Sequence, residues 1–350
     1  MAEAKFLLKS ELSDKLTFSK NLGGIIMDTQ IRGLHHVTAM TSSAEKNYRF
    51  FTDILGLRMI KKTVNQDDIE TYHLYFTDDA GAPGTDMTFF DFPNIPKGTK
   101  GTNSISRTGF RVPTDASLDY WTKRFSDLNV EHGEIKERFG KKYLEFHDYD
   151  DQLFQLVSDE KNHGVAGGTP WKNSNVPAEH AIIGLGPTIV TVAKFEHLKL
   201  VLENLLGFEE TAEEGSLHQF EVGEGGNGAT ILVDDQPDMI PAQEGYGNVH
   251  HLALRVADDE ALRDWIEKIN ALEFPSSGFV DRFYFQSEYF LAAPNVLFEL
   301  ATDGPGFLQD ESYEHAGEIL SLPPHLQSKR EEIEEYVRPF DTSDANHKRQ

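Results

Sequence analysis

Two pairs of adjacent histidines and one glutamate within an apolar run are the groups in this sequence best suited to chemistry. The pairs are His35-His36 and His250-His251, and each lies at the start of a predicted strand. Glu299 lies within the apolar run 296–300, where an unpaired charge is costly, so a partner must compensate for it. Because side chains alternate along a strand, we expect Glu299 to face the concavity of a curved sheet.

Two histidines and one carboxylate from three strands would form a facial triad with open coordination positions. This arrangement is typical of non-haem Fe(II) oxygen chemistry, with Mn(2+) as the usual substitute. Zinc and nickel more often have closed or four-ligand sites. Two simpler interpretations exist: the histidine pairs could be solvated strand ends, and Glu299 could form a salt bridge with Arg282 or Arg255. The positions of these groups within an internal repeat favour the metal site.

The chain contains four copies of one pattern, in which an apolar strand precedes an amphipathic helix and three further strands. The histidine pairs belong to copies one and four, whereas the same place reads Ser-Arg-Thr at 106–108 in copy two and Gly-Pro-Thr at 186–188 in copy three. Gln155 occupies in copy two the position that Glu299 has in copy four. A duplication that left only some copies in use would produce this distribution. The first strands are expected at 34–40, 105–112, 185–193 and 249–256.

Each copy therefore reads βαβββ, which leaves one sheet face bare, so the copies are expected to pair. The helix of copy one should cover 44–55 and begin with a capping box formed by Ser42 and Glu45. We predict an α+β fold of four βαβββ modules, paired into two domains whose curved mixed sheets form a metal-lined cavity. The expected segments are an N-terminal extension (1–30), a domain of modules 1 and 2 (31–163), a linker (164–177), a domain of modules 3 and 4 (178–305) and a polar tail with a helix near 327–337 (306–350).

The composition excludes several classes of function. The 350 residues include 33 Lys and Arg against 58 Asp and Glu, a formal charge of −25, so nucleic acids and anionic membranes are unfavourable partners. The absence of cysteine excludes disulfides, thiolate metal sites and cysteine nucleophiles. The longest apolar stretch, 181–193, is shorter than the ~20 residues of a membrane-spanning helix. No secretory signal is recognisable, so we expect a cytoplasmic protein.

Six short motifs stand out along the chain: Gly33-Leu34-His35-His36-Val37-Thr38, Leu55-Gly56-Leu57, Tyr72-His73-Leu74-Tyr75-Phe76, Gly81-Ala82-Pro83-Gly84-Thr85, His250-His251-Leu252-Ala253 and Asp281-Arg282-Phe283-Tyr284-Phe285. They resemble the vicinal oxygen chelate superfamily, which includes the glyoxalases. Within it they look like the ring-cleaving dioxygenases of the hydroquinone-dioxygenase type. The likeness covers about residues 31–340.

The resemblance implies that the second histidine of each pair is a ligand, so that His36, His251 and Glu299 would hold the iron. It also implies that Tyr289 and Arg282 lie beside the substrate. His35 and His250 would then stand behind the two ligand histidines as further catalytic groups. The chain departs from the family at Pro294-Asn295, where relatives often have glycines. We interpret His73, in the middle of a strand, as a structural histidine that could line the cavity.

These expectations define a function and two alternatives. The first hypothesis is an Fe(II)-dependent dioxygenase that opens a dihydroxylated aromatic ring, most simply a para-hydroquinone, with a small aromatic substrate and O2 as its partners. The second is a glyoxalase-type lyase or isomerase with Zn or Ni. The third is a non-catalytic resistance protein that binds an aromatic or quinone ligand. Association into a homo-oligomer is left open.

Overall fold

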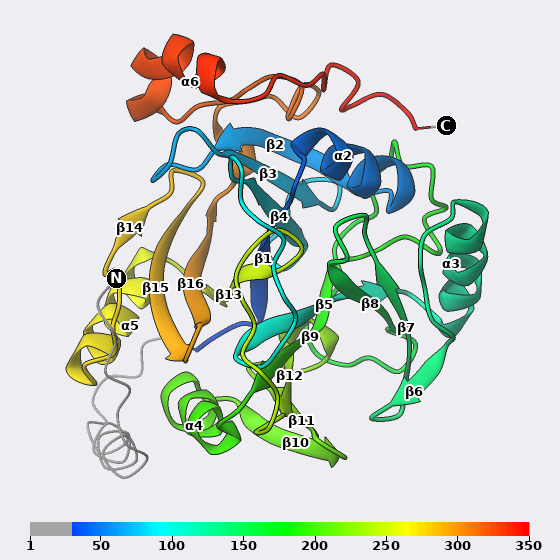
Figure 1. Cartoon of the computed structure of the whole chain (residues 1–350), viewed down its shortest axis with the longest axis vertical. Helices are drawn as coiled ribbons and strands as arrows, with labels where there is room; N and C mark the ends of the chain where they lie inside the picture. Colours follow the sequence, from blue (N-terminus) through cyan, green and yellow to red (C-terminus); the bar gives the residue numbers. More distant parts are fainter. Residues whose placement is uncertain (1–29, 350) are drawn as a thin grey trace.

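The computed structural model describes residues 30–349, so the extension predicted for 1–30 lies almost wholly outside the described part. The described residues form two eight-stranded sheets of mixed strand direction, and helices pack against them (Figure 1). This is the α+β architecture of curled mixed sheets that the repeat predicted.

The first sheet combines strands from the beginning and the end of the described chain. They are β1 (Leu34–Met40), β2 (Arg58–Val64), β3 (Tyr72–Thr77), β4 (Asp86–Asp91), β13 (Val249–Val256), β14 (Val280–Asp281), β15 (Phe285–Ala293) and β16 (Val296–Pro305). Their order in space is β14-β15-β16-β13-β1-β4-β3-β2. At the centre of this sheet β1 and β13 run antiparallel, with Val37 opposite Leu252.

The second sheet is built in the same way from the middle of the chain. Its strands are β5 (Ser104–Val112), β6 (Lys136–Arg138), β7 (Lys141–His147), β8 (Leu153–Ser158), β9 (Leu185–Val192), β10 (Glu209–Glu214), β11 (Leu217–Glu221) and β12 (Thr230–Asp235). Their order is β10-β11-β12-β9-β5-β8-β7-β6, with β5 and β9 antiparallel at the centre.

The predicted domains implied that module one pairs with module two and module three with module four, but the sheets combine the modules differently. Modules one and four share the first sheet, and modules two and three share the second. The physical reason is that the first strand of each module has an unpaired edge. The first strand of any other module can form backbone hydrogen bonds with that edge. The repeat alone therefore does not select the partner. The boundaries 31–163 and 178–305 stay a prediction.

The helices follow the predicted pattern but differ in their last turns. α3 (Asp115–Asp127) and α5 (Asp259–Ala271) are regular α-helices. α2 (Ala44–Arg49) continues as a π-helical turn at Phe50–Ile54, and α4 (Phe195–Leu200) continues likewise at Val201–Leu206. Apolar spacing marks the buried face of such a helix but does not report a local change of hydrogen-bond pattern.

The predicted capping box of α2 is wrong by one residue. Ser43 is the N-cap, and its side chain accepts a hydrogen bond from the backbone N–H of Lys46. Ser42 instead donates to the carboxylate of Asp150, and its backbone N–H also donates to that group at 2.8 Å. The side chain of Ser42 is therefore bonded to Asp150, which is distant in the sequence, and Ser43 caps the helix instead.

The C-terminal segment lies across the first sheet near β2 and includes α6 (Arg330–Tyr336), preceded by a 3-10 turn at Pro324–Lys329 (Figure 1). It is held by polar contacts to buried groups. The ammonium of Lys61 on β2 lies 2.7 Å from the Asp310 carboxylate, and the Tyr48 hydroxyl donates to Asp344 at 2.7 Å.

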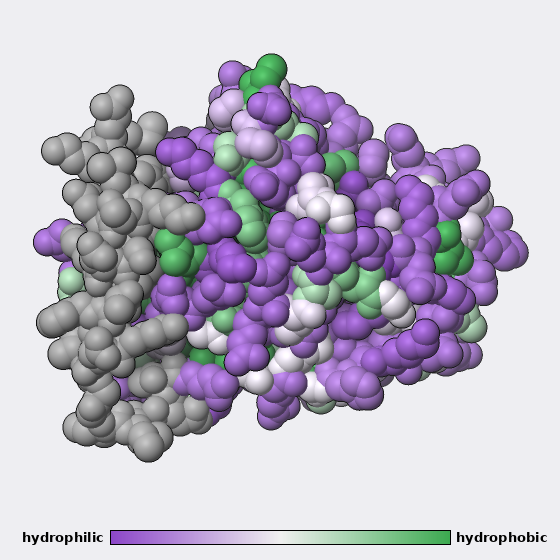
Figure 2. Space-filling view, turned by 90° about the horizontal axis from the view of Figure 1, so that it is seen from below, coloured by the Kyte–Doolittle hydropathy of each residue, from purple (hydrophilic) through white to green (hydrophobic). Residues whose placement is uncertain are grey.

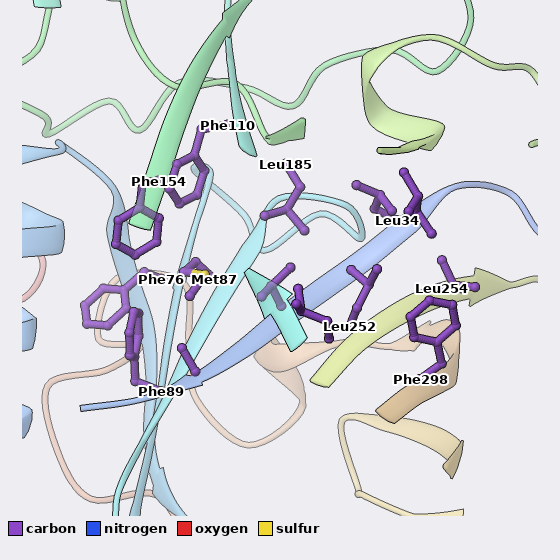
Figure 3. Close-up of a cluster of buried hydrophobic side chains, with 14 of the residues drawn as sticks. Leu34, Phe76, Met87, Phe89, Phe110, Phe154, Leu185, Leu252, Leu254 and Phe298 are labelled. Carbon is purple, nitrogen blue, oxygen red and sulfur yellow. The ribbon is translucent and has the colours of Figure 1, made fainter. Parts of the chain in front are cut away.

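A continuous apolar core joins the two sheets. Phe110, Phe154 and Leu185 from the second sheet approach Phe76 and Met87 from the first (Figure 3). The face of the molecule in Figure 2 is mostly hydrophilic with scattered apolar residues, as the charge of the sequence suggests. Within the part of the chain that the structure describes, no helix is long and apolar enough to cross a membrane.

Candidate metal centre and its pocket

The first sheet brings His36, His251 and Glu299 together from three neighbouring strands, β1, β13 and β16. The Nε2 atoms of His36 and His251 lie 3.1 Å apart. The Oε2 atom of Glu299 lies 3.1 Å from the first and 3.0 Å from the second. All three side chains are buried, with exposed fractions of 1%, 3% and 0%. The antiparallel β1–β13 pair, with β16 parallel to β13, produces this convergence.

Neither arginine considered as a salt-bridge partner contacts Glu299. Arg255 pairs with Asp303 at 2.7 Å, and Arg282 pairs with Asp67 at 2.8 Å. Ser287 donates to Oε1 of Glu299, whereas Oε2 is buried and has no hydrogen-bond partner. Burial alone would raise the pKa of Glu299, but the two imidazoles beside it hold that pKa well below its usual range. An ionised oxygen is therefore left facing two ring nitrogens.

The hydrogen bond of His35 shows which nitrogen of His36 carries a proton. His35 Nε2 lies 3.1 Å from the carbonyl oxygen of Thr302, which can only accept. Burial lowers the pKa of His35 to about 3, so its ring is neutral and its Nδ1 is an acceptor. His36 Nδ1, at 2.9 Å, must donate to that acceptor. In the neutral form of the ring that a metal ligand must have, the Nε2 of His36 then presents its lone pair towards Glu299.

His250 stands in the same relation to His251, with their Nδ1 atoms 2.8 Å apart. Burial lowers the pKa of His251 to about 3, so this ring is also neutral. His250 lines the pocket and its side chain is 28% exposed, whereas His35 is buried in the interior. The structure thus places both histidines behind the convergent pair, but only His250 reaches the pocket.

The three convergent atoms fit a divalent cation. A carboxylate oxygen without a donor, beside ring nitrogens that can offer lone pairs to the same point, is a donor set that suits a metal ion. A cation between them would satisfy the buried Oε2 of Glu299. The histidine behind His36 would fix the orientation of that ligand, as is usual for metal-bound histidines.

A pocket of about 470 Å³ opens over the convergent atoms. Phe90 and Phe285 form apolar walls, and Leu297 lines the pocket from the same face of β16 as Glu299. The cavity is large enough for a single aromatic ring with small substituents. The strand alternation that predicted the direction of Glu299 is therefore confirmed.

Tyr289 and Arg282 line the same pocket. Tyr289 lies on β15 directly opposite Glu299, and its ring is 5.5 Å from the ring of His251. The Nε of Arg282 donates to the Tyr289 hydroxyl at 3.2 Å, while its terminal nitrogen binds Asp67. Burial raises the pKa of Tyr289, which keeps its hydroxyl protonated.

His73 is a hydrogen-bonded histidine in the wall of the pocket, which agrees with the expectation from the sequence, whereas its partner Tyr75 was not predicted there. Its Nδ1 lies 2.8 Å from the Tyr75 hydroxyl, its Nε2 lies 2.9 Å from the Thr88 hydroxyl, and Thr88 lies 2.7 Å from Thr38. His73 and Tyr75 both line the pocket. The alternation of β3 puts these two residues on one face, and that signal could have placed Tyr75 in the wall of the cavity as well.

Comparisons with known proteins were made on the whole chain. A sequence model of the Glyoxalase/Bleomycin resistance protein/Dioxygenase superfamily matches residues 33–163. A presumed ring-cleaving dioxygenase of Bacillus subtilis, MhqA, is 42% identical over 316 residues, which cover 89% of this chain and 99% of the relative. The chlorohydroquinone/hydroquinone 1,2-dioxygenase of Sphingobium indicum is 31% identical over 312 residues, which cover 87% and 95%. The crystal structure of a presumed dioxygenase from Bacillus subtilis has a TM-score of 0.82 at 35% identity, covering 89% of this chain and 98% of the other.

Proposed function

Because this chain belongs to the glyoxalase/bleomycin resistance protein/dioxygenase superfamily, in the branch of the ring-cleaving dioxygenases, we propose that it opens the ring of a para-hydroquinone with O2 and an Fe(II) ion. The observation that carries this proposal is the convergence of His36, His251 and Glu299 on one point under a pocket of aromatic size. The name of the Sphingobium relative supports the hydroquinone as the substrate class.

In this proposal His36, His251 and Glu299 hold the metal. Fe(II) bound there would supply the redox chemistry with O2, and the open coordination positions of a facial triad suit that role. Mn(2+) would fit the same donor atoms. The buried walls of the pocket keep bulk water away from the convergent atoms.

Tyr289 and Arg282 orient the substrate and supply a proton. Because Arg282 donates to the oxygen of Tyr289, the hydroxyl proton of Tyr289 is free to point at a substrate oxygen. Arg282 is itself held by Asp67, so the tyrosine is oriented before a ligand enters. This arrangement makes Tyr289 a hydrogen-bond donor and general acid towards the ring substituent.

His250 is the second group placed for proton transfer. Its Nδ1 is occupied by His251, but the ring lines the pocket and its Nε2 is 4.0 Å from the Glu244 carboxylate. Burial lowers the pKa of His250, so its ring is neutral. Because its Nδ1 accepts the Nδ1–H of a His251 that binds metal through Nε2, the proton of His250 lies on Nε2, which can donate a hydrogen bond to a substrate oxygen. His35 lacks this access and acts by holding His36 in position.

The proposal is tested by loading the protein with Fe(II) without oxygen, measuring bound metal and then following oxygen uptake with hydroquinone and with catechol. We expect about one bound iron, substrate-dependent oxygen uptake and loss of both in Glu299→Ala, since a triad cannot hold iron without its carboxylate. Glu210→Gln is the matched control, because Glu210 belongs to a separate Glu210–Glu213–His218 group on the other sheet.

Two outcomes would replace the proposal with an alternative. Turnover of a thiol hemiacetal with zinc or nickel, without oxygen uptake, would identify a glyoxalase-type enzyme. Tight binding of hydroquinone without any turnover would identify a binding protein. A Glu299→Ala variant with full iron and full ring cleavage would refute the assigned ligand set.

A further inference from the structure

The second sheet contains a counterpart of the metal centre with different chemistry. In the first sheet Ala253 pairs with Glu299 between parallel strands, and in the second Gly109 pairs with Gln155 in the same way. Two residues before each paired position lie His251 and Arg107, respectively. The counterpart thus has an amide in place of the carboxylate and a guanidinium in place of an imidazole. The concave face of the second sheet therefore lacks the metal-binding groups of the first sheet at these two positions and carries a positive charge instead.

A small cavity lies on this side of the second sheet. Residues of β6, β7, β8, β9, β11 and β12 contribute to its wall. Its polar lining residues are Arg138, Lys141, Tyr143, Gln155 and Gln219. Two of these are cations, and none of the residues that line the cavity is a carboxylate. The space is about 20 Å³ and is open to solvent on one side, so it admits the oxygen atoms of a small anion but not an aromatic ring.

The positive charge around this cavity is only partly balanced. Arg138 donates to the Gln155 side-chain oxygen at 3.4 Å and approaches the Glu145 carboxylate only to 3.8 Å. Arg107 approaches the same carboxylate to 3.5 Å. One carboxylate is therefore shared by two guanidinium groups whose side chains are only 11% and 15% exposed. Largely buried charges that lack full pairing are costly.

Lys141 adds a third positive charge with a neutral partner. Its ammonium donates to the side-chain oxygen of Asn227 at 2.8 Å. Burial lowers the pKa of Lys141, and the carboxylates of Glu221 and Asp159 oppose that effect only in part. Asp159 is already paired with Arg111 at 2.7 Å. The lysine therefore has no dedicated counter-ion among the described residues.

We propose that this cavity is a binding site for a small oxyanion, such as the carboxylate of a small organic acid or inorganic phosphate. The planar fork of Arg138 would take two oxygens of the anion, and Lys141 would supply a point charge. Gln155 and Gln219 lie at the same wall, but their amide N–H groups are already bonded to Pro187, Thr211 and Glu221, so the two cations would supply the donors. The site is separate from the convergent histidines and does not depend on the proposed reaction.

The test is thermal unfolding and calorimetric titration of the full chain with sodium acetate, sodium phosphate and sodium chloride at constant ionic strength. We expect acetate and phosphate to raise the Tm saturably and to give a measurable Kd. Arg138→Gln and Lys141→Gln should weaken binding by about tenfold or more, since each removes a charged donor. Lys141→Arg should retain binding because it keeps the charge.

Lys142→Gln is the matched control. Lys142 is the next residue on β7, is 46% exposed and pairs with Asp115, so it points away from the cavity. This variant should bind both oxyanions as the wild type does. Equal binding by Arg138→Gln, Lys141→Gln and the wild type would overturn the proposal. So would an equal effect of chloride, which would indicate general electrolyte stabilisation. Selective binding of acetate or of phosphate would identify which oxyanion the site prefers.

Discussion

At the scale of single residues, the two histidine pairs are equivalent in sequence but not in structure. His35 is buried and bonded to the Thr302 carbonyl, which fixes its proton and thereby the orientation of His36. His250 faces the pocket and has no comparable carbonyl acceptor among its described contacts. One pair thus holds His36 in a fixed orientation, and the other connects His251 to the pocket.

The rigid pair leads to a prediction about metal retention. Replacing His35 with Phe keeps the ring packed near Phe285, 5.3 Å away, but removes the acceptor for His36 Nδ1–H. We expect metal affinity to fall by about 10- to 100-fold, the usual effect of losing such a partner. Competition with a chelator, followed by metal analysis, measures this loss.

His180→Phe provides the comparison, because His180 stacks on Tyr120 far from the metal centre in sequence and structure. This variant should retain metal as the wild type does. Unchanged metal retention in His35→Phe would show that the Thr302–His35 contact does not position the ligand.

At the scale of elements, strand β15 serves two environments through its alternation. Ser287 and Tyr289 point to the metal centre, where they contact Glu299 and Arg282. Glu288, between them, points to the opposite face and is fully buried. Neither of its carboxylate oxygens has a hydrogen-bond partner within the described structure. The face of β15 opposite to Ser287 and Tyr289 therefore carries a buried carboxyl group whose ionisation would destabilise the fold.

This buried acid predicts a pH-dependent stability. Burial raises the pKa of Glu288 from 4.5 to about 7, so the folded state binds its proton more tightly than the unfolded state does. The contribution of Glu288 to stability is complete below pH 4.5 and is lost as the pH rises through 7. Glu288→Met should therefore stabilise the fold by about 2 kcal/mol at pH 8 and by much less at pH 5.

Urea unfolding at the two pH values measures this difference. Glu267→Met, on the exposed face of α5, should show no comparable dependence on pH. A Glu288→Met variant that is equally or less stable than the wild type at pH 8 would contradict the account of β15.

At the scale of the whole molecule, most of the strand arrangement within each module could be predicted from the sequence, because the same pattern occurs four times. The four first strands, the alternation around Glu299 and the positions of the histidine pairs each follow from local patterns. The partner of each module does not, because the exposed edge of β1 is chemically like that of β5 or β9. The place of His73 in the cavity wall agrees with the prediction. Its hydroxyl partners Tyr75 and Thr88 could not be predicted, because only the folded sheet creates these side-chain contacts.

The pairing of modules predicts cooperative unfolding. One apolar cluster connects both sheets, and Leu252 at the β1–β13 contact is fully buried within it (Figure 3). Leu252→Ala should destabilise the protein by about 3 kcal/mol and shift one common transition. Fluorescence of variants that retain only Trp121 or only Trp265 would report the second and first sheets separately. Two separated transitions would show that the sheets are independent units.

The most direct test of the central claim is anomalous X-ray scattering at the iron edge from crystals grown with Fe(II) under anaerobic conditions. The account predicts a single strong iron peak bonded to Nε2 of His36, Nε2 of His251 and Oε2 of Glu299. An iron peak at another place, such as the Glu210–Glu213–His218 group, or no peak between these three side chains, would contradict this prediction.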